Sequence, residues 1–202
     1  MPMKRLFQWL LPMLLILLSV PALARDRDKE REAIKQSFGR VGFLGATTRE
    51  GSTVLAPHLT VDVLGDSRLV LPSGFLFSFQ GGMSHRGWVK QDCRLQTSSI
   101  LAALRPGGSL RVSGNKVRLD LMGGVFASYD LWGSQEYETY SIPLRRIDGY
   151  KRFDFGLNGG VSFVIWKFEI YTEFRQGLID IYSESDLRET SFVWSVGIGW
   201  SF

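Results

Sequence analysis

The chain has 202 residues, of which 45% are hydrophobic, 22% charged and 13% aromatic, with a formal net charge of +4. That length suits a single domain, and the apolar content is too high for a disordered chain. One cysteine and two histidines exclude an internal disulfide framework and make a metal site hard to build. We therefore expect no metal and no cofactor.

Residues 1–24 have the pattern of a cleaved signal peptide. Lys4 and Arg5 form a basic start, Leu10 to Val20 an apolar stretch, and Ala22-Leu23-Ala24 a cleavage site. The apolar stretch is shorter than the roughly 20 residues that a transmembrane helix needs, so an uncleaved anchor is the less favoured alternative.

Cleavage would remove two of the 24 basic residues and none of the 20 acidic ones, which leaves a net charge of +2. Such a balanced surface gives no argument for a nucleic-acid partner. Residues 25–36 alternate in charge sign without an apolar face, which predicts a solvated, periplasmic N-terminal segment.

After residue 36, apolar and polar residues alternate with a period of two, which is typical of β-strands. Eight segments show it: 37–48, 56–65, 73–84, 93–105, 116–131, 153–165, 167–178 and 190–202. Most have about ten residues, the length that a tilted strand needs to cross a bilayer. We therefore predict an all-β fold over 37–202, an eight-stranded antiparallel transmembrane β-barrel of the outer membrane.

The connections between these segments also fit a bacterial barrel. The fifth and seventh, about 132–152 and 179–189, are the longest, and the sixth is only Trp166-Lys167. If the N-terminus is periplasmic, the long connections face outward and the tight hairpin faces the periplasm, as in bacterial barrels.

The polar faces of the segments carry charges of both signs near mid-strand. A narrow barrel would place them inside, where they need partners. We predict an interior polar network of Arg118, Asp120, Glu169, Glu173 and Arg175. The glycines 156, 160, 197 and 199 fall on the same inward faces, where small residues leave room for long side chains.

Aromatic residues near the strand ends are predicted to lie at the membrane interfaces, where amphipathic rings are favoured. Tyr129 and Trp132 would lie at the outer interface, and Trp166 and Trp200 at the periplasmic one. Because an eight-stranded barrel has a filled interior, we do not expect a general porin.

The stretch FDFGLNGGVSFVIWKFEIYTEFRQGLIDIY, followed by SFVWSVGIGWSF, resembles the PorT-like outer membrane β-barrel family of Bacteroidetes. SGFLFSFQGGMSHRG and LMGGVFASYDLWG resemble its earlier strands, whereas 85–115 departs from the family pattern. The resemblance implies an outer membrane barrel, and the terminal Phe202 resembles the signal read by the barrel assembly machinery. It does not imply a role in protein secretion.

The function predicted from these observations is structural, or a binding role for the long loops 132–152 and 179–189 toward a protein or a glycan, with outer membrane lipid around the barrel. One alternative is a soluble periplasmic lipocalin-like barrel, with apolar residues inside and charges outside. A lipid-modifying enzyme using Ser84-His85 with Asp130 or Glu136 is less favoured, because adjacent strand residues point to opposite faces. We predict no catalytic residues.

Overall fold

The computed structural model describes residues 33–50, 53–54, 56–90, 93–113, 116–182 and 189–202, and nearly all of them are in strands. The elements are β1 (Ile34–Glu50), β2 (Thr53–Val54), β3 (Ala56–Val70), β4 (Phe75–Lys90), β5 (Cys93–Ser113), β6 (Val117–Tyr137), β7 (Ser141–Pro143), the 3-10 helix η1 (Leu144–Arg146), β8 (Phe153–Ile165), β9 (Phe168–Gly177) and β10 (Glu189–Ser201). In this part of the chain, no helix is long and apolar enough to cross a membrane. The predicted signal peptide and residues 25–32 lie outside the described residues.

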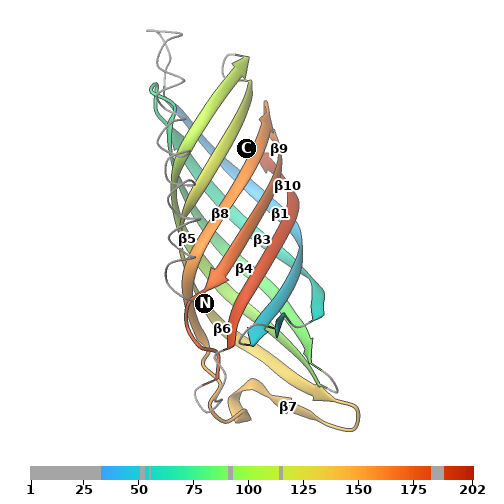
Figure 1. Cartoon of the computed structure of the whole chain (residues 1–202). Helices are drawn as coiled ribbons and strands as arrows, with labels where there is room; N and C mark the ends of the chain where they lie inside the picture. The colour runs from blue at the N-terminus through green and yellow to red at the C-terminus, as the bar shows by residue number, and fades with distance from the viewer. Residues whose placement is uncertain (1–32, 51–52, 55, 91–92, 114–115, 183–188) are drawn as a thin grey trace.

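Eight of the strands form a closed ring, in the order β1, β3, β4, β5, β6, β8, β9 and β10. All neighbours are antiparallel, and β10 closes the ring on β1, with Val41 opposite Ile198 (Figure 1). The short strands β2 and β7 lie off the ring and pair with β1 and β6. Because the ring is closed, no strand edge of the ring is left open. A structure made of strands can span a bilayer only when its sheet has no open edge.

The two faces of the barrel are the reverse of those in a soluble protein. The outward side chains of Phe43 and Ile198 are 62% and 67% exposed, whereas the inward Arg40 and Asp62 are 1% and 0% exposed. Charges inside and apolar residues outside are the pattern of a transmembrane barrel. The predicted fold class is therefore confirmed. The alternative, a lipocalin-like barrel with apolar residues inside and charges outside, does not agree with these exposed fractions.

Strands β5 and β6 extend further than predicted. β5 continues to Ser113, so the expected strand end at residue 105 is wrong. Pro106 lies within β5 opposite Phe77 of β4, while the ladder to β6 omits Arg105 and Pro106 and resumes at Gly107. A proline that cannot donate to one neighbour interrupts that ladder without ending the strand. Strand β1 also extends further than predicted, because it begins at Ile34 rather than at residue 37.

The long connection predicted at 132–152 is partly strand. β6 continues to Tyr137, and β7 folds back on it with Gln135 opposite Ile142. This hairpin, with η1, projects beyond the ring at the lower end of Figure 1. The described part of the other long connection is residues 178–182, and Glu189 already belongs to β10.

At the opposite end, β8 and β9 are joined by the two residues Trp166 and Lys167. Trp166 has a φ of 57°, a left-handed conformation that is uncommon for residues other than glycine. We call this the β8–β9 end of the barrel, and the end that carries β7 the hairpin end.

Candidate functional site

The most distinctive site of the molecule is an ion-pair network that fills the barrel. Ion pairs of 4 Å or less connect five arginines with five carboxylates, so the formal charges cancel. Its members, all at most 3% exposed, are Arg40, Arg68, Arg105, Arg118, Arg175, Asp62, Asp66, Asp120, Glu169 and Glu173. We refer to this set as the central network.

Strand geometry explains how the sequence brings these charges together. Residues two apart on a strand point to the same face, so Asp66 and Arg68 on β3 both face inward, as do Arg118 and Asp120 on β6. Each pair also forms an ion pair within its strand, with nitrogen–oxygen distances of 2.6 Å and 3.0 Å. Alternating sign at a spacing of two residues therefore forms part of the network within single strands.

Contacts across the barrel complete the central network. Arg68 reaches Asp120 at 2.9 Å and also pairs with Glu169. Arg105 pairs with Asp66 and with Glu173, both at 2.7 Å. Because these residues come from β3, β5, β6 and β9, the network links strands that are not neighbours in the ring.

Neutral polar groups supply further hydrogen bonds to the carboxylates. The hydroxyls of Ser78 and Ser109 donate to Asp66 and Asp120, each at 2.6 Å. The amide of Gln80 donates to Glu173 at 3.1 Å. Such bonds are required because an ion pair in a dry interior compensates its desolvation only when its remaining polar atoms are also engaged.

Three arginines of the network contact aromatic rings: Arg68 and Arg118 lie near Phe38, and Arg40 lies on Tyr171. The guanidinium carbon of Arg40 is 3.5 Å from the centre of the Tyr171 ring, which is a cation–π contact. The ring has room because glycines face it. A Cβ built on Gly42 would lie 2.4 Å from the Tyr171 hydroxyl oxygen, and one built on Gly197 would lie 2.6 Å from it.

The structure places all five sequence-predicted interior residues, Arg118, Asp120, Glu169, Glu173 and Arg175, in the central network. Sequence reasoning left five members out of the predicted network, among them Asp62, which lies inside the second predicted strand. Asp66 and Arg68 lie beyond the predicted end of the second strand, and Arg105 lies at the predicted end of the fourth. Arg40 lies inside a predicted strand, and its alternation with the outward Val41 and Phe43 was the signal that could have identified it.

A second, smaller ion cluster lies toward the hairpin end. Arg86 on β4 pairs with Asp130 at 3.1 Å and with Asp154 at 3.6 Å. Ser99 donates to Asp130 at 2.6 Å and Ser191 to Asp154 at 2.5 Å. This cluster links β4, β5, β6, β8 and β10.

An apolar cap closes the hairpin end above this cluster. The buried side chains of Trp88, Leu95, Leu144 and Ile181 pack together, with Ile147, Tyr150 and Tyr182 against them. Leu144 and Ile181 come from the two long connections, and Trp88 and Leu95 from the ends of β4 and β5. The long connections are thus folded onto the barrel mouth by hydrophobic contacts.

Tyr150 joins the cap to the neighbouring ion cluster. Its hydroxyl donates to Asp130 at 2.5 Å, and its ring lies edge-on to Tyr182 with centroids 5.6 Å apart. Burial raises the pKa of the Tyr150 phenol well above its ordinary value, and the neighbouring Asp130 raises it further. The phenol therefore stays protonated at neutral pH and keeps donating to Asp130. Tyr182 is also part of this cap.

The four predicted interface aromatics are all exposed. Trp166 lies in the β8–β9 turn and Trp200 near the end of β10, whereas Tyr129 and Trp132 lie within β6. Tyr129, Trp132, Trp166 and Trp200 are 40%, 56%, 68% and 46% exposed. Trp200 packs edge-on against Phe168 with ring centroids 4.0 Å apart. Phe202 is 85% exposed, and its ring would lie 3.4 Å from a Cβ built on Gly39.

The residues considered for catalysis are not brought together. Ser84 is buried and faces the interior, whereas His85 is exposed on the other face and bonds Ser98 at 2.9 Å. Asp130, the acidic partner considered for it, is engaged by Arg86, Ser99 and Tyr150. Among the described residues, no group of three or more His, Cys, Asp or Glu side chains could hold a metal ion.

No family model matches the chain, and no curated protein matches it. Among solved structures, Ail, the attachment invasion locus protein of Yersinia pestis, is 13% identical with a TM-score of 0.46 and covers 86% of this chain and 100% of its own. Neisserial surface protein A is 11% identical with a TM-score of 0.49 and covers 82% and 97%. The outer membrane protein OprG from Pseudomonas aeruginosa is 9% identical with a TM-score of 0.40 and covers 86% and 97%. These likenesses are remote, and they assign a role to no individual residue.

Proposed function

We propose that this chain is a small barrel of the outer membrane with a structural role and a binding role for its hairpin end, and that it is neither a general porin nor an enzyme. The observation that carries this proposal is the combination of a lipid-compatible outer face with an interior filled by the central network. A barrel with such an interior has no open aqueous path of the kind that porins need.

The proposal includes the route and the orientation. The sequence patterns described above support three further parts of this proposal. The signal peptide directs export, and the barrel assembly machinery inserts the chain with Phe202 as its recognition signal. The chain is a member of the PorT-like family of Bacteroidetes. The hairpin end faces the cell exterior and the β8–β9 end the periplasm, in accordance with the usual placement of long loops and short turns.

The hairpin end offers a surface for a protein or a glycan. The rings of Tyr137 and Tyr140 are stacked with centroids 4.6 Å apart, and Tyr140 is 56% exposed. The neighbouring Arg145 and Arg146 are exposed. Exposed aromatic rings beside arginines are enriched where proteins bind partners.

Two measurements test the membrane location. A folded barrel resists extraction by carbonate and migrates differently on a gel before and after boiling. We expect both properties, and release of the chain by a carbonate wash without detergent would contradict the proposal.

Cysteine labelling on intact cells tests the orientation. In a Cys93→Ser background, Tyr140→Cys should react with a membrane-impermeant maleimide, whereas Lys167→Cys should react only after the outer membrane is opened. The reverse pattern would place the hairpin end in the periplasm.

A further inference from the structure

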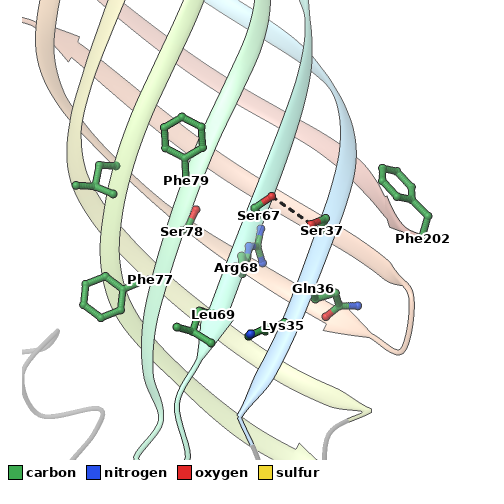
Figure 2. A pocket seen from close by; sticks show the side chains of 11 residues that line it. Lys35, Gln36, Ser37, Ser67, Arg68, Leu69, Phe77, Ser78, Phe79 and Phe202 are labelled. Atoms are coloured by element: carbon green, nitrogen blue, oxygen red, sulfur yellow. Dashed lines mark hydrogen bonds between the residues drawn. The ribbon is translucent and has the colours of Figure 1, made fainter.

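A groove of about 500 Å³ interrupts the outer surface of the barrel near its β8–β9 end. It runs over the beginnings of β1 and β4 and the end of β3, with Phe202 at one side (Figure 2). The outer face is otherwise covered by large apolar side chains, so a hollow here requires an explanation.

Two serines in register, Ser37 and Ser67, lie on the floor of this groove, and a pair of glycines follows them on the same face. Ser37 lies opposite Ser67, and Gly39 lies opposite Gly65, on the neighbouring strands β1 and β3. The two serine hydroxyls are hydrogen-bonded to each other at 3.1 Å. That bond uses one hydroxyl proton, so the second proton can be donated to another acceptor.

The walls of the groove are apolar and exposed. Phe77 and Phe79 on β4 are 45% and 58% exposed, Leu104 on β5 is 54% exposed, and Phe202 is 85% exposed. Figure 2 shows the serine pair between Phe79 on one side and Phe202 on the other. A polar floor between apolar walls, on a face that otherwise contacts lipid tails, suits an amphipathic ligand.

The charge around the groove is positive. Lys35, which lies on the same face of β1 as Ser37, lines the groove and is exposed. Lys116 and Lys167, in the turns at the same end, are also exposed. Among the described residues of this end, the carboxylates Asp66, Asp120 and Glu169 are all buried inside the barrel, so none of them offsets the lysines at the surface.

We infer that this groove binds a phospholipid with an anionic headgroup from the periplasmic leaflet. The headgroup phosphate accepts hydrogen bonds from the Lys35 ammonium and from the serine pair, and an acyl chain lies along Phe77, Phe79 and Leu104. Basic pockets on membrane proteins bind anionic headgroups through the same chemistry. The inference rests on the proposed membrane location and orientation of the barrel.

Binding of phosphatidylglycerol to the folded barrel in detergent micelles, followed by native mass spectrometry, tests this inference. Lys35→Gln should weaken phosphatidylglycerol binding about fivefold, as expected for one lysine near an anionic surface. The matched control Lys151→Gln removes an exposed lysine at the hairpin end, away from the groove, and should leave binding unchanged. Wild-type protein should bind phosphatidylcholine, which has no net charge, more weakly than phosphatidylglycerol.

A second variant tests the floor of the groove. The double change Ser37→Val and Ser67→Val fills the hollow with residues that strands favour, and should lower the binding of both lipids. Inorganic phosphate at millimolar concentration should not displace phosphatidylglycerol, because it lacks the acyl chain.

Three results would overturn the inference: equal effects of Lys35→Gln and Lys151→Gln, equal binding of the two lipids by the wild type, or displacement by inorganic phosphate. Heat-modifiable migration of every variant shows whether the barrel has folded. Absence of heat-modifiable migration in the wild type would contradict the proposed function. A folded wild-type barrel that binds both lipids equally would contradict only the inference that the groove binds an anionic phospholipid.

Discussion

Arg105 shows what a buried charge in this barrel requires. Its side chain is fully buried, and it donates to Asp66 and Glu173 at 2.7 Å each. Taking an ion out of water costs several kcal/mol, and the attraction between partners compensates this cost only while both are present. Removing one member of such a pair should therefore be worse than removing both.

The pair of Asp62 and Arg175 allows a direct test of this reasoning. Either Asp62→Leu or Arg175→Leu alone should lower the free energy of unfolding by about 3–5 kcal/mol, because a buried charge loses its main partner. The double variant should lose less than either single change. Urea unfolding in detergent micelles measures all three, and a double variant with the sum of the single losses would contradict the argument.

The contact between Gly42 and Tyr171 leads to a second prediction at this scale. Gly42→Ala should cost about 1–3 kcal/mol, because its Cβ would meet the Tyr171 hydroxyl at 2.4 Å, while the next nearest atom is 3.3 Å away. Tyr171→Phe removes that hydroxyl, which has no hydrogen-bond partner in the structure, and keeps the ring under Arg40.

In the Tyr171→Phe background, the cost of Gly42→Ala should therefore fall below about 1 kcal/mol. The same unfolding measurement applied to the four proteins of the cycle gives the difference. An equal cost of Gly42→Ala in both backgrounds would show that the glycine is needed for another reason.

At the scale of single strands, the alternation of faces determines where each side chain meets lipid. Val161 lies midway along β8 and Val112 near the end of β5, and both point outward. An arginine on the lipid face costs about 2–4 kcal/mol at the bilayer midplane but about 0–1 near the interface. The two valines therefore report on depth with the same substitution.

We expect Val161→Arg to destabilise the barrel in lipid vesicles by about 2–4 kcal/mol and Val112→Arg by about 1 kcal/mol or less. Reversible urea unfolding in vesicles, followed by tryptophan fluorescence, measures both. Equal losses of unfolding free energy at the two positions would indicate that they do not lie at different depths in a membrane, and would count against the proposed location.

The strands were largely predictable because a period of two is a local property of the sequence. Their ends were not, since a strand that projects beyond the bilayer loses the apolar half of its pattern. Asp66 and Arg68 were missed because the outward positions beside them, Gly65 and Ser67, carry no apolar side chain. Arg105 was missed because Pro106 suggested a strand end, although a proline removes only one donor. The cap was also beyond prediction, because its contacts between Trp88, Leu144 and Ile181 depend on how distant connections fold.

For the whole molecule, two separate barriers lie along the barrel axis. The apolar cap closes the hairpin end, and the central network fills the middle with paired side chains. The barriers are built from different residues, so one can be opened without disturbing the other. Leu144 belongs only to the cap, and a charge in its place would be left unpaired in an apolar cluster.

Conductance in planar lipid bilayers distinguishes a filled barrel from a gated channel. We expect no stable conductance steps for the wild type, and none for Leu144→Asp, because the central network still blocks the path when the cap is disrupted. Impermeant-maleimide labelling of the buried Trp88→Cys position, in the Cys93→Ser background, should increase in Leu144→Asp and so show that the cap has opened. Steady channel openings in that variant alone would make the cap a gate over a conducting interior, and the reading of the network as a permanent filling would then be wrong.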